Sequence, residues 1–240
     1  MRQILFIHGF PFDATMWQHQ RDAGFPILAP NLPGFGGSKV VPPDPATIGG
    51  YADFVWEVVK AQKEKPIVAG LSMGGYVLLE LLRQHAADVA GAILIDTRAE
   101  ADSAEARANR LKSIEDVRAN GTKNVIDGLM TRLLAPDATE ATKAEVRGIM
   151  ERQSPEAVIA AQTAMANRRD QTDWLPQLKL PTLIIVGEKD IITPPPAART
   201  MHAAIAGSRL LEIPGVGHMS AMEDPAAVNE AIREFAAGVP

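Results

Sequence analysis

Short apolar runs alternate with longer amphipathic segments along most of this chain. The runs are largely continuous rather than alternating with polar residues, which is typical of strands that are covered on both faces of a parallel sheet. They occupy residues 4–7, 26–29, 66–69, 92–95, 182–186 and 209–213. Helical spacing of apolar residues is found at 13–20, 48–62, 74–85, 194–206 and 224–237. Regular strand–helix alternation predicts an α/β fold with a doubly wound, mostly parallel sheet.

One region departs from this alternation. Between the fourth and fifth expected strands there is no strand pattern, and the segment is rich in Ala, Arg and Glu. Helical stretches are expected at 103–114, 114–120, 123–134, 139–153 and 155–168. We therefore expect residues 98–174 to form an all-helical cap, inserted into a core that comprises residues 1–97 and 175–240.

Composition narrows the classes of protein that this chain could belong to. A chain of 240 residues can bury a sizeable core without disulfides, and it contains no cysteine, which excludes thiolate chemistry. The net charge is −5 and there is no basic cluster, so we expect neither nucleic acid nor an anionic membrane as a partner. No apolar run has the length of a membrane span. We expect a soluble, cytoplasmic protein.

The strongest chemical signal is the sequence Gly70-Leu71-Ser72-Met73-Gly74. It lies directly after an expected strand and directly before an expected helix, which is the context of a nucleophile elbow. Glycines on both sides allow a tight turn, and the helix N-terminus favours developing negative charge near the hydroxyl. Ser72 is the candidate nucleophile.

A serine hydroxyl needs a base to remove its proton. Of the five histidines, only His218 lies in a loop after the last expected strand, where glycines precede it. His19, His85 and His202 fall on or near expected helices, where solvent-exposed or capping roles are expected. His218 is the candidate general base.

The base in turn needs an acid that orients its ring and stabilises its positive charge. Asp190 follows the strand expected at 182–186, and the order Ser72, Asp190, His218 matches the chain order of this class of hydrolase. Asp96, at the end of the strand expected at 92–95, is an alternative acid or could share the role.

Acyl transfer also needs donors that stabilise an oxyanion. One candidate is the backbone N–H of Met73, the residue after the nucleophile, and the second is the N–H of Phe10, in the loop after the first strand. We expect His8 to hold that loop in place rather than to act as a base.

These motifs together resemble the α/β-hydrolase superfamily. The likeness rests on the elbow, the His-Gly-Phe-Pro loop at residues 8–11, Gly-Glu-Lys-Asp at 187–190 and Gly-Val-Gly-His at 215–218. The resemblance covers the whole chain except the helical insertion, which stands where the family keeps its cap. Within the family, the chain most resembles small bacterial carboxylesterases, enol-lactonases and cofactor-free perhydrolases. One departure is Asn31, which replaces the aspartate that usually begins its loop. A serine at the elbow argues against the dehalogenase and epoxide-hydrolase branches, which place a carboxylate there.

The sequence says less about the substrate. Arg98 stands where the insertion leaves the core and could bind a substrate carboxylate, or it could pair with Glu100 or Asp102. We expect Phe12, Met130 and Trp174 to contribute to an apolar pocket, although methionines in the insertion could equally fill a helical core. No metal-ligand motif or dinucleotide-binding motif is present, so neither a metal nor another cofactor is expected.

We therefore expect a serine hydrolase of small to medium carboxylic esters or lactones, with a small-molecule partner and an undetermined oligomeric state. Two alternatives use the same triad: a cofactor-free perhydrolase and a carbon–carbon bond hydrolase. A third is a ligand-binding protein without catalytic activity.

Overall fold

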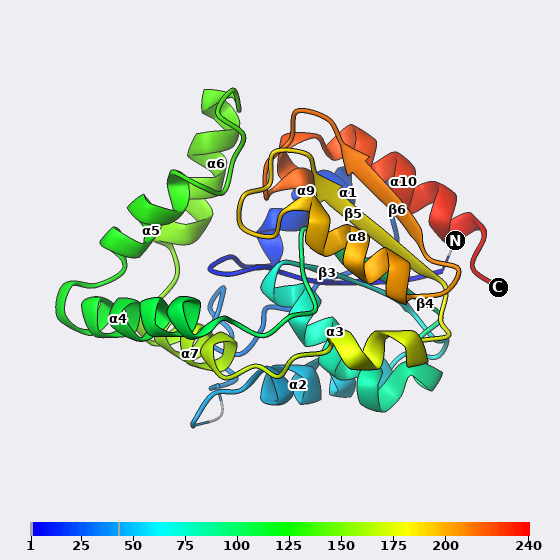
Figure 1. Ribbon diagram of the computed structural model, residues 1–240, viewed down its shortest axis with the longest axis horizontal. Helices are drawn as coiled ribbons and strands as arrows, with labels where there is room; N and C mark the ends of the chain where they lie inside the picture. The colour runs from blue at the N-terminus through cyan, green and yellow to red at the C-terminus, as the bar shows by residue number, and fades with distance from the viewer. Residues whose placement is uncertain (1, 43) are drawn as a thin grey trace.

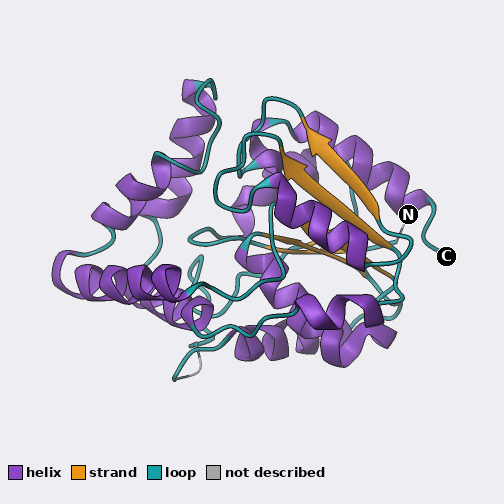
Figure 2. Ribbon diagram, viewed as in Figure 1, coloured by secondary structure: helices purple, strands orange, loops and turns teal. Residues whose placement is uncertain are grey.

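The computed structural model describes residues 2–42 and 44–240 of the chain. Its centre is a six-stranded sheet in which every neighbouring pair is parallel, in the order β2-β1-β3-β4-β5-β6 (Figures 1 and 2). The strands are β1 (Ile4–Ile7), β2 (Ile27–Leu28), β3 (Ile67–Leu71), β4 (Gly91–Ile95), β5 (Thr182–Gly187) and β6 (Arg209–Ile213). The fold class expected from the sequence is confirmed.

Helices cover both faces of the sheet. The first group comprises α2 (Ile48–Lys60), α3 (Met73–His85) and α8 (Pro195–Ala204). The second comprises α1 (Gln18–Asp22), α9 (Ser220–Glu223) and α10 (Pro225–Ala237). Short 3-10 helices occur at η1 (Ala14–Trp17), η2 (Ala86–Asp88) and η3 (Thr172–Gln177).

The buried strands supply two separate hydrophobic cores because successive side chains point to opposite faces. In β1, Leu5 and Ile7 pack with α2, α3 and α8, whereas Ile4 and Phe6 pack with η1 and α10. All four are 0% exposed. Burial on both faces explains why these strands have continuous apolar runs rather than alternating ones.

Four helices lie in the chain between β4 and β5, and they project to one side of the sheet (Figure 1). They are α4 (Ala104–Asn120), α5 (Lys123–Met130), α6 (Glu140–Glu151) and α7 (Pro155–Ala166), and we call them the α4–α7 segment. Side chains of Ser103, Thr139 and Ser154 cap the N-termini of α4, α6 and α7. The two helices expected at 103–114 and 114–120 form one continuous helix, because no glycine or proline interrupts them.

None of the helices in the described part of the chain is both long enough and apolar enough to cross a membrane.

Candidate active site

The turn at Ser72, between β3 and α3, has an unusual backbone. Its φ angle of 53° lies in the left-handed region, where a side chain is strained. A Cβ atom at Gly74 would overlap the carbonyl oxygen of Ile7, and one at Gly70 would overlap the carbonyl oxygen of Gly74. The glycines are therefore required by close backbone contacts, and the turn presents a partly exposed serine at the end of the sheet.

Two contacts from the neighbouring strand fix this strained turn. The N–H of Ser72 donates to the carbonyl oxygen of Ile95 at 2.9 Å. The hydroxyl of Thr97 donates to the carbonyl oxygen of Ser72 at 2.8 Å. The serine is thus tied to the end of β4 on both sides of its Cα atom.

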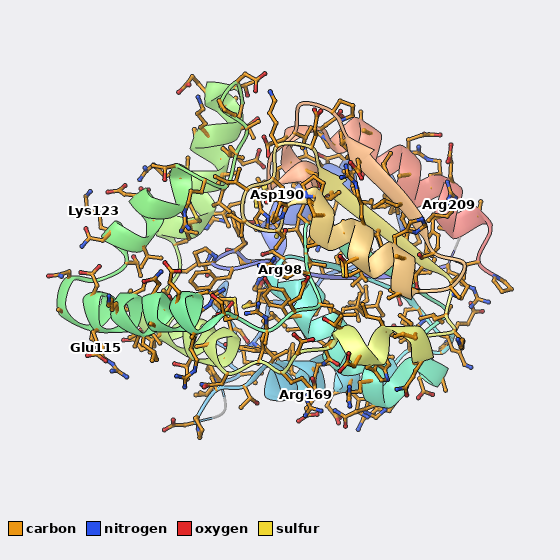
Figure 3. The ribbon with its side chains drawn as sticks, viewed as in Figure 1. Arg98, Glu115, Lys123, Arg169, Asp190 and Arg209 are labelled. Carbon is orange, nitrogen blue, oxygen red and sulfur yellow. The ribbon has the colours of Figure 1, made fainter. Side chains whose placement is uncertain are left out.

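The three residues predicted as a triad are brought together. The Nε2 atom of His218 is 2.8 Å from Oγ of Ser72, and its Nδ1 atom is 2.7 Å from Oδ2 of Asp190. His218 is 2% exposed and Asp190 is 2% exposed, so the pair is shielded from water. Figure 3 shows Asp190 at the edge of the core that faces the α4–α7 segment. With Nδ1 donating to Asp190, Nε2 is free to accept the serine proton.

A tight turn after β5 holds the carboxylate of Asp190. Its Oδ1 accepts the N–H groups of Ile192 and Thr193 at 2.8 and 2.9 Å, and its Oδ2 accepts the Thr193 hydroxyl at 2.7 Å. Thr193 is a functional neighbour that the sequence analysis did not assign. The signal was available, because a threonine three residues after an aspartate commonly bonds it back across such a turn.

The charges of this site act on one another. Burial acts to lower the pKa of His218, but the negative charges of Asp190 and Asp96 outweigh it, and the pKa is raised above its ordinary value. Burial acts to raise the pKa of Asp190, and the charge of His218 with the hydrogen bonds from Thr193 outweighs it, so this pKa is lowered. The arrangement favours an ionised acid beside a histidine that holds a proton readily.

Asp96, the alternative acid, is buried, and within the described residues it makes no hydrogen bond to the imidazole. Its carboxylate accepts the N–H of Gly187 at 3.0 Å and the hydroxyl of Ser220 at 2.6 Å. Burial, together with the charge of Asp190, raises the pKa of Asp96 to about 7. Asp96 thus joins the end of β5 to the loop that follows His218, whereas Asp190 is the one of these two aspartates that is hydrogen-bonded to the histidine ring.

His8 holds the loop that carries Phe10. Its Nε2 atom accepts the N–H of Leu32 at 3.0 Å, and its Nδ1 atom is 2.9 Å from the carbonyl oxygen of Gly9. Burial lowers the pKa of His8 to about 4, so the ring stays neutral. Asn31 ties the following loop by accepting the N–H of Ala14 and donating to the carbonyl oxygen of Gly36, both at 2.8 Å.

Glu223 is a second residue that the sequence analysis did not assign. Its carboxylate accepts three backbone N–H groups, from Ala135 at 2.8 Å, Gly217 at 3.1 Å and Met219 at 3.2 Å. The N–H of His218 itself donates to the carbonyl oxygen of Leu133 at 2.8 Å. The loop between α5 and α6 is therefore bonded directly to the loop that carries the histidine. A lone glutamate on a short helix has no sequence pattern that would have indicated this.

Ser72 and His218 open into a cleft of about 400 Å³ between the core and the α4–α7 segment. Its wall includes Phe10, Tyr76 and Ile192 from the core. Helices α4 to α7 and their connections supply both apolar and polar side chains, with Arg110 of α4 and Arg132 just after α5 among them.

Four residues predicted to bind substrate lie outside this cleft. Phe12 is 0% exposed and belongs to the same hydrophobic core as Ile4 and Phe6, and Met130 packs against this core. Trp174 packs against the core on the opposite face of the sheet. Arg98 lies where the chain leaves β4 for the α4–α7 segment (Figure 3). Its Nε atom is 3.4 Å from Oε2 of Glu100, which is the surface pairing expected as the alternative to binding substrate.

No group of three or more His, Cys, Asp or Glu side chains in residues 2–42 and 44–240 is arranged to hold a metal ion.

Comparison with known proteins places this geometry in a family. The profile of the Alpha/beta hydrolase family matches residues 4–231. The chain belongs to this family. It is accordingly a hydrolase, and the resemblance noted from its motifs is confirmed.

Two solved structures and one curated protein that are similar to this chain are named as esterases or as a lactonase. The structure of an esterase from Thermogutta terrifontis with malate bound has 38% identity and a TM-score of 0.95, covering 100% of this chain and 90% of that one. The enol-lactonase from Burkholderia xenovorans has 26% identity and a TM-score of 0.89, covering 98% of this chain and 91% of that one. A pimeloyl-acyl-carrier protein methyl ester esterase of Neisseria meningitidis is 28% identical over 250 residues, which covers 100% of this chain and 95% of that protein.

The raised pKa of His218 predicts the pH dependence of this hydrolase. A general base must be neutral, so activity falls as the pH drops through the pKa of the histidine. Because that pKa is raised, we expect the acidic limb of kcat/KM to have its midpoint above the ordinary histidine value of about 6.5. Measuring kcat/KM as a function of pH, from acidic to alkaline values, gives this midpoint. If kcat/KM did not fall as the pH was lowered through the histidine pKa, the result would contradict a role for His218 as base.

Replacing the two buried aspartates separates their roles. We expect Asp190→Asn to lower kcat by about a thousandfold or more, because the amide no longer holds the ring in the required tautomer. Asp96→Asn keeps the size of the side chain, replaces one acceptor oxygen with an NH2 group and removes one charge that raises the pKa of His218. We expect it to lower kcat by less than about tenfold and to move the acidic limb to lower pH. Steady-state kinetics would contradict this assignment if Asp96→Asn were the more damaging change.

Proposed function

We propose that this hydrolase cleaves small to medium carboxylic esters or lactones through an acyl-enzyme intermediate on Ser72. The observation that carries the proposal is the hydrogen-bonded chain Ser72–His218–Asp190, which ends at a hydroxyl facing the cleft. A neutral imidazole at this distance can take the serine proton as the new bond to carbon forms.

The reaction then follows from the positions of the donors and acceptors. Ser72 Oγ attacks the ester carbonyl carbon while His218 Nε2 accepts its proton, and Asp190 stabilises the resulting imidazolium. As the tetrahedral intermediate collapses, the bond to the alcohol oxygen breaks and His218 returns the proton to that oxygen. A water molecule, activated by the same histidine, attacks the acyl group and releases the carboxylic acid and free Ser72.

The backbone N–H groups of Phe10 and Met73 are our candidates for the oxyanion hole. Within the described residues, neither group donates to any acceptor. Phe10 lines the cleft beside Ser72, and Met73 is the first residue of α3, where a helix leaves its N–H groups without internal partners. Free N–H groups fixed in advance are what stabilisation of a developing oxyanion requires.

The size and position of the cleft support a substrate of limited size. A volume of about 400 Å³ lies toward the small end of ligand-binding pockets. We propose that the α4–α7 segment, within residues 98–174, acts as a cap over this cleft, on a core formed by 1–97 and 175–240. The names of the similar enzymes, two esterases and a lactonase, agree with cleavage of such carboxyl esters. A chain without cysteine suits the reducing cytoplasm, where we propose that it acts.

Substitution of the nucleophile tests the proposal. We expect Ser72→Ala to lower the release of p-nitrophenol from acetyl, butyryl and octanoyl esters by at least about ten-thousandfold, because the acyl-enzyme can no longer form. The wild type is assayed beside it, and the profile across the three esters reports the size of the pocket.

Ser208→Ala is the matched control. Its hydroxyl is also 2.9 Å from a histidine ring, that of His202, but on an exposed surface. We expect this variant to retain wild-type rates. Equal background rates in the wild type and Ser72→Ala would refute ester hydrolysis for these substrates and would favour the perhydrolase, carbon–carbon hydrolase or ligand-binding alternatives.

A further inference from the structure

The wall of the cleft has an unbalanced positive charge. Two arginines, Arg110 and Arg132, are among the residues that line it. No Asp or Glu is among the described residues of this lining. Cations without facing carboxylates in a partly enclosed cleft attract an anion.

The two arginines differ in how far they are neutralised. Nε of Arg110 is 2.6 Å from Asp102, but Asp102 is also paired at 2.6 Å with Arg168. Asp102 is therefore shared between two guanidinium groups, and Arg110 does not have this carboxylate to itself. Within the described chain, the Nη groups of Arg110 donate to no acceptor.

Arg132 lacks an acidic partner altogether among the residues that the structure describes. Its one hydrogen bond there, of 3.3 Å, runs from Nε to the carbonyl oxygen of Gly128, which carries no formal charge. The neighbouring carboxylate of Asp127 is already engaged by Lys123 and Arg147. The terminal N–H groups of Arg132 are thus available to a molecule in the cleft.

We propose that the physiological substrate carries a carboxylate in addition to its ester group, and that Arg132, assisted by Arg110, binds this carboxylate. The inference rests on the proposed function, because it concerns a second chemical group on the ester that Ser72 is proposed to cleave. A guanidinium group binds a carboxylate through two parallel N–H donors, which fixes orientation as well as adding affinity. The carboxylate end lies against α4 and the end of α5, while the ester lies among Phe10, Tyr76 and Ser72.

Two pairs of esters of similar length test whether the charge is recognised. Monomethyl glutarate carries a carboxylate on its acyl part, and methyl hexanoate is its neutral counterpart. Acetoxyacetate carries a carboxylate on its alcohol part, and propyl acetate is its neutral counterpart. Titration of the acid released gives kcat/KM for each. We expect the wild-type enzyme to prefer the charged ester of at least one pair by about tenfold or more.

Variants of Arg132 show which residue gives that preference. We expect Arg132→Met to lower the ratio of charged to neutral kcat/KM by about tenfold or more, mainly through KM, and Arg132→Lys to restore part of it. Arg118→Met is the matched control, because Arg118 of α4 is exposed like Arg132 but is not among the residues that line the cleft, and it is paired with Glu115. Its ratio should match the wild type.

Two results would overturn the proposal while leaving ester hydrolysis intact. One is equal or weaker activity of the wild type on the charged ester of both pairs. The other is an unchanged ratio in Arg132→Met.

If none of the four esters were turned over, the proposed function would be in question, and binding would decide the anion site separately. Calorimetric titration measures glutarate binding in the absence of catalysis. The Ser72→Ala variant is compared with the double variant that carries both Ser72→Ala and Arg132→Met. Binding that is lost on removal of Arg132 supports the site, whereas equal binding or no binding to either protein excludes it.

Discussion

The strained turn at Ser72 is the constraint on which the rest of the site depends. A φ angle of 53° is unfavourable for a residue with a side chain, and the turn persists because its neighbours hold it. Glycines at 70 and 74 admit the carbonyl oxygens that pack against them, and Ile95 and Thr97 bond the serine from β4. The parallel sheet thus supplies both the strain and the contacts that maintain it, and it places the hydroxyl where loops from β1, β5 and β6 meet.

Two buried carboxylates and one partly buried carboxylate organise those loops. Asp190 orients the histidine ring, Asp96 joins the end of β5 to the segment after His218, and Glu223 gathers N–H groups from the histidine loop and from the linker after α5. Because each carboxylate accepts several donors, burial costs less than it would for an unpaired charge. The histidine loop is consequently bonded to both the core and the loop between α5 and α6, so this part of the cleft wall lies next to the catalytic groups.

Much of the fold and the central chemistry could be predicted from local sequence. The strands of the parallel sheet have continuous apolar runs, and the elbow, the two strand-end loops and their order along the chain indicate Ser72, Asp190 and His218. The cleft wall could not be predicted in this way, since it depends on how α4 and α5 pack over the core. Arg98 follows the end of β4, which is bonded to the serine, yet it pairs with Glu100, whereas Arg132 reaches the cleft from the end of α5.

The central claim is a covalent acyl group on Ser72, and rapid acid quenching during turnover of p-nitrophenyl acetate tests it most directly. Mass spectrometry of the quenched protein should show a gain of one acetyl group, located by peptide mapping on Ser72 and absent from Ser72→Ala. An acetyl group located on another residue in the wild type, or turnover with no acylated enzyme at any quench time and no initial burst of p-nitrophenol, would contradict the account.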